Sequence, residues 1–163
     1  SRVALVAALS RAVARSEPGG AAYRDDFDYR HVVAFTGSRD VGRAWTLGAK
    51  WQFVGGRPYT AHVVRDTLVG GFEVTPNVAS NVVSNVSGRN EERYPSYRRL
   101  DLRVTRRVRW RGREVGLVVE ARNALNRANV RSWHFDSATG AFEPVHQFPR
   151  LILVGLTAAL PRL

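Results

Sequence analysis

The sequence predicts an all-β fold and, within that class, an antiparallel segment of a transmembrane β-barrel with about six strands. Three observations predict it. Apolar and polar residues alternate with a period of two over segments of about ten residues, the length of a tilted transmembrane strand. Short and long connections alternate strictly between these segments, as do the short periplasmic turns and long extracellular loops of outer-membrane barrels. No run of about 18 apolar residues is present, so a transmembrane helix is not predicted.

Six segments have strand character. They are residues 2–15, 29–38, 44–54 (with a continuation toward Val64), 100–110, 115–123 and 151–160. The third is the clearest, because bulky apolar residues occupy every second position from Trp45 to Phe53 and polar or small residues fill the gaps. In the first two segments both faces are small or apolar, so the sequence does not determine which face is which.

The connections carry as much information as the strands. "SRDVGR" (38–43) and "RGRE" (111–114) are tight turns with a glycine each. The other connections span about 12, 30 and 20 residues, and the last two, 66–97 and 131–147, are expected to be extracellular loops without regular structure. Loops of that kind are unusual in a compact soluble domain, which favours the membrane interpretation.

The charge balance is strongly basic, with a net charge of +11 in 163 residues and Lys50 as the only lysine. Such a bias can indicate a nucleic-acid partner. Here the arginines alternate with apolar residues instead of forming a solvated block, so we interpret them as one face of strands. The absence of cysteine excludes disulfides and thiolate metal sites.

Aromatic residues lie near the expected strand ends. Trp45 follows one tight turn and Trp110 precedes the other, so both are predicted at one membrane interface. Tyr59 and Tyr97, with Tyr94 and Phe148, are near the opposite strand ends. Two such girdles are typical of outer-membrane barrels, although aromatic residues at strand ends also occur in soluble sandwiches.

Five motifs occur in series along the chain. They are "DYRH" (28–31), "GGRPYT" (55–60), "RYPSYRRLDLRV" (93–104), "EARNALNRANV" (120–130) and "PRLILVGLTAAL" (149–160). Together they resemble the C-terminal barrel strands of TonB-dependent outer-membrane receptors, and the resemblance covers nearly the whole chain. One departure is the ending "AALPRL", where the family usually has an aromatic residue, so that Leu160 or Leu163 would take its place.

The resemblance implies a fold, a function and partners. Residues 1–163 would be the C-terminal part of a barrel of about 22 strands, with the plug domain and the earlier strands outside this chain. The implied function is TonB-energised uptake of a siderophore, metal complex, vitamin or oligosaccharide across the outer membrane. The implied partners are outer-membrane lipid, the plug and remaining strands, the inner-membrane energy-coupling complex and the barrel-assembly machinery. No nucleic-acid partner is expected.

The arginine-rich strand then has a lipid face and a lumen face. With "RGRE" as a two-residue turn, the lipid-facing pairs are expected to be Trp110 with Val115, Val108 with Leu117 and Val104 with Ala121. On the lumen face, Thr105 would oppose Glu120. The predicted lumen charge network comprises Asp101, Arg103, Arg107, Glu120 and Arg122. Arg106 falls on the lipid face and is expected to reach the headgroups from near the turn.

Nothing in the sequence predicts catalysis, a cofactor or a metal. His31 near Asp26 and Asp28 lacks a nucleophile, and a structural histidine is the simpler interpretation. His134, Asp136 and His146 share one loop without tight ligand spacing. The "NVS" at Asn85 matches a glycosylation sequon only by chance. The alternatives are a soluble basic β-protein that binds nucleic acid, or a small self-contained outer-membrane barrel, which needs about eight strands.

Overall fold

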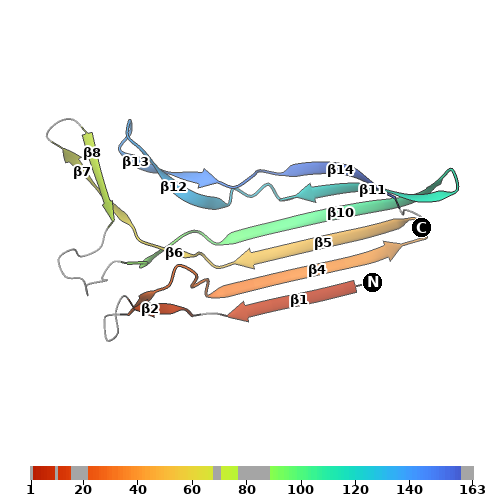
Figure 1. Cartoon of the computed structure of the whole chain (residues 1–163), viewed down its shortest axis with the longest axis horizontal. Coiled ribbons are helices and arrows are strands. Elements are labelled where there is room, and N and C mark those ends of the chain that lie inside the picture. The colour runs from red at the N-terminus through yellow and green to blue at the C-terminus, as the bar shows by residue number, and fades with distance from the viewer. Residues whose placement is uncertain (1, 10, 16–21, 68–70, 77–88, 159–163) are drawn as a thin grey trace, which may run out of the picture.

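The computed structural model describes residues 2–9, 11–15, 22–67, 71–76 and 89–158. Six long strands form one antiparallel sheet in a single layer (Figure 1). In sheet order they are β1 (Arg2–Leu9), β4 (His31–Val41), β5 (Trp45–Val54), β10 (Tyr97–Trp110), β11 (Arg113–Arg122) and β14 (Leu151–Ala158). The prediction of an antiparallel all-β fold is confirmed. None of the described residues forms a helix long and apolar enough to cross a membrane.

The six strands coincide with the six predicted segments, with one exception. Residues 2–15 were expected as a single strand, but the chain leaves the sheet after β1. Residues Val13–Arg15 form β2, which pairs with β3 (Ala22–Arg24) in a separate two-stranded ribbon. The small side chains of this segment, which left its phase undetermined, give a long strand no stronger preference than a turn and a second short strand.

The two tight turns lie at one end of the sheet and the long connections at the other (Figure 1). The expectation that the long connections lack regular structure is wrong. Within residues 66–97, β9 (Glu92–Arg93) pairs with β6 (Pro58–Tyr59), and β8 (Gly71–Pro76) forms a hairpin with β7 (His62–Thr67). The expected continuation of the third strand toward Val64 is also wrong, because β5 ends at Val54 and β6 and β7 pair outside the sheet. The second long connection contains a hairpin of β12 (Val130–Asp136) with β13 (Ala141–His146). Residues 77–88, which include Ser84 and Asn85, lie outside the described residues.

The turn between β12 and β13 has a local signal in the sequence, "DSATG". The carboxylate of Asp136 accepts hydrogen bonds from the N–H of Ala138 and the hydroxyl of Thr139, both at 2.9 Å. Gly140 follows with a φ of 66°, a conformation that glycine adopts without steric cost. An aspartate that binds the backbone two residues on, with a glycine at the end, is turn chemistry that a hairpin uses.

The register between β10 and β11 differs from the predicted one by two residues. Arg111 and Gly112 both have positive φ, 50° and 76°, which is the signature of a type I′ turn. The strands therefore meet as Val104 with Val119 and Arg103 with Glu120. Because side chains alternate with a period of two, a shift of two changes every partner but leaves every residue on its predicted face.

Two adjacent glycines end β5 where the chain passes close to other backbone. A Cβ on Gly56 would lie 1.7 Å from the carbonyl oxygen of Tyr94, and one on Gly55 would lie 3.0 Å from that of Tyr29. No larger residue fits at Gly56 without moving the Tyr94 backbone. This close crossing joins the end of β5 to the long connections at the same end of the sheet. We call these connections, residues 22–30, 55–67, 71–76, 89–96 and 123–150 as far as they are described, the loop layer.

The sheet has no hydrophobic core within the described residues. Val118 is the one buried hydrophobic side chain, whereas Val3, Val154 and Leu156 are more than two-thirds exposed. The buried polar side chains are those of Asp28, Asn90, Asn123 and Asn129. The usual distribution is inverted, since apolar side chains of the strands are open and polar side chains of the loops are covered.

We expect the isolated chain not to be a stable monomer in water without detergent. The apolar side chains of its strands would be exposed to water, and among the described strands β1 and β14 each leave one edge open to another chain. Sedimentation together with thermal melting followed by circular dichroism tests this. Aggregation without detergent and a monodisperse β-rich species with detergent are the expected results. A cooperative melt from a detergent-free monomer would contradict the prediction.

Candidate functional site

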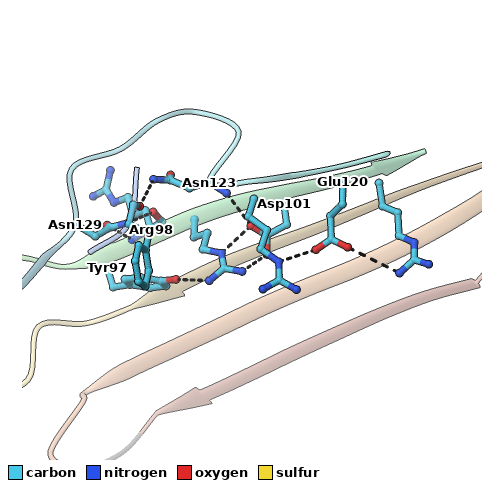
Figure 2. Close-up of polar contacts among 10 residues, drawn as sticks. Tyr97, Arg98, Asp101, Glu120, Asn123 and Asn129 are labelled. Atoms are coloured by element: carbon cyan, nitrogen blue, oxygen red, sulfur yellow. Dashed lines mark hydrogen bonds and ion pairs between the residues drawn. The ribbon is translucent and has the colours of Figure 1, made fainter. Parts of the chain in front are cut away.

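One face of the sheet carries the charged side chains that the sequence predicted as a network. Asp101, Arg103 and Arg107 occupy alternate positions of β10, and Glu120 and Arg122 occupy the facing positions of β11. Figure 2 shows Asp101 and Glu120 on the same side of the sheet. We call this side the charged face. A hollow of about 730 Å³ lies over it toward the short turns, lined in part by Asp40, Arg103 and Arg107.

The observed ion pairs join two of the expected residues to Glu120 and connect the others elsewhere. Arg122 Nε lies 2.8 Å from Glu120 Oε1, and Arg103 Nη1 lies 3.9 Å from Glu120 Oε2. Arg107 belongs to the same predicted network, but its Nη2 lies 2.8 Å from Asp40 Oδ1 on β4. The structure therefore does not bring Arg107 to Glu120.

Asp101 binds a residue that sequence reasoning did not include. Arg99 donates from Nε and Nη2 to the two carboxylate oxygens of Asp101, at 2.7 and 2.6 Å, in a bidentate pair. Arg99 is two positions away on the same strand, hence on the same face. The two-residue spacing of Arg99 and Asp101 in "RRLDL" was the available signal.

Two buried asparagines attach the loop after β11 to the end of β10. Asn129 accepts from the N–H of Arg98 at 3.0 Å and donates to its carbonyl at 2.9 Å, which replaces a missing strand partner (Figure 2). Asn123 donates its main-chain N–H to Asp101 and its amide to the carbonyls of Arg127 and Phe148. The motif "NALNRAN" is therefore a structural connector between the sheet and its loops.

A pocket of about 560 Å³ lies among the long connections. Its wall is largely aromatic: the rings of Tyr59 and Tyr94 are 4.6 Å apart, and the guanidinium of Arg57 lies 4.6 Å from the centre of the Tyr94 ring. Trp133 also lines it, and its indole N–H is buried without a hydrogen-bond acceptor among the described residues. Burial raises the pKa of Tyr59, and the nearby Glu92 carboxylate raises it further.

One edge of the pocket is polar. Asn90 and Asp26 both line it, and the amide of Asn90 donates to Asp26 Oδ1 at 2.6 Å and to the carbonyl of Arg24 at 2.7 Å. Thr60 donates its hydroxyl to Asn90 Oδ1 at 3.4 Å. The pocket thus combines aromatic faces, a cation and amide and carboxylate oxygens. Such a lining suits a ligand with rings or flat faces and several hydroxyl or carbonyl groups.

The pair of Asp28 and Arg93 lies at the base of the loop layer. Arg93 Nη2 lies 2.5 Å from Asp28 Oδ2, while Nη1 donates to the carbonyls of Asp28 and Gly56, each at 2.7 Å. Burial raises the pKa of Asp28, but the hydrogen bonds from Arg93 and from the Ala12 N–H outweigh it and hold the pKa below its ordinary value. This pair links the segment before β4 to the end of β5 and to β9.

The predicted interface aromatics do not all share one environment. Trp45 and Trp110 are exposed on the face opposite the charged face. Tyr97 lies on the charged face, where its hydroxyl accepts a hydrogen bond from Arg99 at 3.4 Å. Tyr59 lies in the pocket wall.

The histidines considered earlier stay apart from one another. Asp28 is bound to Arg93 and not to His31. His134 faces Glu143 across the β12–β13 hairpin, whereas His146 faces Val130 at its far end. Within the described ranges no group of three or more histidine or acidic side chains could hold a metal ion.

No family model, curated protein or solved structure matches this chain.

Replacing Asp28 with Asn should loosen the loop layer. The change removes the charge but keeps the shape, and leaves the Arg93 guanidinium without its counter-charge in a largely buried site, at a cost of about 3 kcal/mol. In detergent, amides near residues 55–58 and 90–94 should exchange hydrogen faster, while amides within β10 and β11 should not. Glu143→Gln, which changes an exposed carboxylate of β13, is the matched control.

The same pair gives a pH dependence with a defined sign. Because folding lowers the pKa of Asp28, its contribution is present above the ordinary carboxyl pKa and is lost as the pH falls through the lowered value. Loop protection should therefore persist at pH 5 and fall below about pH 4. A wild-type profile identical to that of Asp28→Asn would contradict the role of this pair.

Proposed function

We propose that the chain is the C-terminal part of the barrel of a TonB-dependent outer-membrane receptor, which takes up a scarce ligand such as a siderophore, metal complex, vitamin or oligosaccharide. The resemblance of the five motifs motivates the family. The two faces and the two edges of the sheet support the proposal independently of that resemblance.

The observation that carries the proposal is the contrast between the two faces of a single-layer sheet. The face opposite the charged face, which we call the apolar face, carries a continuous apolar surface over all six strands. Its residues on β14 are Ile152, Val154, Leu156 and Ala158. No described element covers this face, and its bulky residues are exposed. Exposure of so large an apolar surface to water is unfavourable. Lipid acyl chains are fluid and can cover an apolar surface of any shape.

The charged face fits the lumen of a barrel. Arg99, Arg103, Arg107 and Arg122 form ion pairs with three carboxylates of the same face, so part of the positive charge of this face is balanced within the sheet. Pairing of this kind within one face fits the polar wall of a wet channel.

The two free edges fit a sheet that continues in both directions. β1 pairs only with β4, and β14 only with β11, among the described strands. Open edges are unfavourable in lipid, so a barrel must supply a partner for each. Six strands are too few to close a barrel alone, which argues against a small self-contained one.

The pocket among the long connections would be one ligand-contacting surface of the receptor. Loops on a rigid scaffold commonly carry the binding residues. The aromatic wall, which includes Trp133, gives a ligand stacking surfaces.

Fractionation of cells that contain the native protein tests the proposal. An antibody raised against this chain should detect the protein in the outer membrane, extracted by detergent and not by high salt. A soluble nucleic-acid binder would instead appear in the cytosolic fraction and be released by nuclease. That result would exclude the receptor assignment.

The topology gives a second test. An epitope inserted at Ala138, in the β12–β13 turn, should be reached by antibody on intact cells, because the long connections would lie outside. The matched insertion at Gly112, in the β10–β11 turn, should be labelled only after the outer membrane is permeabilised. The reverse pattern would exclude the proposed orientation.

A further inference from the structure

Arginines on the two faces of the sheet differ in their partners. The six strands contain four carboxylates, Asp40, Asp101, Glu114 and Glu120, and strand register assigns all four to the charged face. The apolar face thus carries arginines but no acidic residue. Whatever neutralises those arginines has to come from outside the sheet.

Four arginines lie on the apolar face. Arg98 lies at its long-loop end beside Phe53, and the other three lie at the short-turn end. Arg39 lies opposite Leu47, Arg106 opposite Trp45, and Arg113 opposite Trp110, all on the apolar face. Arg43 and Arg111 lie in the two turns beside them. We call these five residues the arginine belt: Arg39, Arg43, Arg106, Arg111 and Arg113. All are exposed, and none forms an ion pair with a residue that the structure describes.

Two tryptophans support the belt. The guanidinium of Arg106 lies 5.2 Å from the ring centre of Trp45, and that of Arg111 lies 5.1 Å from the ring centre of Trp110. A cation–π contact positions a guanidinium without using its N–H donors. The donors remain free for an anion, and a guanidinium pairs with phosphate through two parallel hydrogen bonds.

The position of the arginine belt along the strands, next to the short turns, indicates which ligand it contacts. Arg106 faces Trp45, the first residue of β5, and therefore lies level with the β4–β5 turn. An arginine on a lipid face is strongly unfavourable at the bilayer centre and tolerated near the interface. In the proposed membrane position the belt meets phosphate headgroups, and the apolar face above it meets their acyl chains.

We propose, building on the proposed function, that the arginine belt binds the phosphates of anionic phospholipids in the leaflet next to the short turns. The chemistry recognised is a phosphate that carries net negative charge and is attached to acyl chains. The same phosphate chemistry exists in free inorganic phosphate, but the apolar surface directly beside the belt selects the lipid.

The experiment measures which lipid lies beside the two belt tryptophans. The full-length receptor that the proposed function implies, with every tryptophan except Trp45 and Trp110 replaced by Phe, is reconstituted in phosphatidylcholine bilayers. These contain either brominated phosphatidylglycerol or brominated phosphatidylcholine at equal mole fraction. Bromine on the acyl chains quenches tryptophan on contact, so the two quenching curves give the relative association of the two lipids.

The expected result is a preference of about five-fold or more for phosphatidylglycerol, since one arginine near an anionic surface contributes about that factor. The variant Arg106→Gln, Arg111→Gln, Arg113→Gln, which retains Arg39 and Arg43, should lose most of the preference. The matched control Arg98→Gln, Arg127→Gln, Arg131→Gln removes the same charge from exposed residues at the long-loop end and should retain it. A double variant, Arg111→Gln, Arg113→Gln, changes only the tip of the β10–β11 hairpin. It should lose part of the preference for phosphatidylglycerol.

Three results would overturn the proposal. The first is equal quenching by both lipids in the otherwise unaltered chain. The second is equal loss of preference in the control, which would indicate a general charge effect. The third is loss of preference on adding inorganic phosphate, which would make the free anion the occupant. Quenching by neither lipid is a different outcome, because it would show that the apolar face does not contact acyl chains and would exclude the membrane function itself.

Discussion

The structure depends on the main-chain hydrogen-bond ladder of one six-stranded sheet. In most proteins of this size a hydrophobic core holds the elements together. Here the described residues contain one buried hydrophobic side chain, Val118, and the strands are joined edge to edge. A ladder fixes strands side by side but covers neither face. Every other property of the molecule, from its exposed apolar face to its internally paired charges, follows from what the two uncovered faces carry.

Polar side chains in the loops replace the missing core at one end of the sheet. Asn129 provides both a donor and an acceptor to the backbone of Arg98, as a neighbouring strand would. Arg93 uses three hydrogen bonds to join Asp28 and Gly56. Buried polar groups are stable when they are hydrogen-bonded. These side chains are largely so, although Arg93 Nε is buried without an acceptor among the described residues. The loop layer is therefore positioned by specific polar contacts, which allows a pocket lined by Tyr59, Tyr94 and Trp133 to keep a defined shape.

The charged face shows why a network cannot be assigned from one hairpin. Arg107 has a carboxylate partner on β4, two strands away in the sheet, and not on the adjacent hairpin strand. Long arginine side chains reach across a neighbouring strand, and they pair with whichever carboxylate the sheet order brings within range. Asp40 is separated from Arg107 by 67 positions in the chain. The pairing is a property of the sheet, and the same sheet leaves the arginines of the opposite face without any acidic neighbour.

The sequence by itself determined the antiparallel fold, the approximate positions of the six strands and, for β5, β10, β11 and β14, the face on which each residue lies. These depend on a period of two, which is local and unaffected by a register shift of two residues. It also determined the strict alternation of short and long connections. Only the tertiary structure decided which residues face each other, because that rests on the backbone conformation of Arg111 and Gly112. Only the tertiary structure revealed the hairpins in the long connections, the pair of Arg99 with Asp101, and the pocket. Their partners come from distant parts of the chain or from turn chemistry too brief to show a period, and hydrophobic alternation carries no information about such contacts.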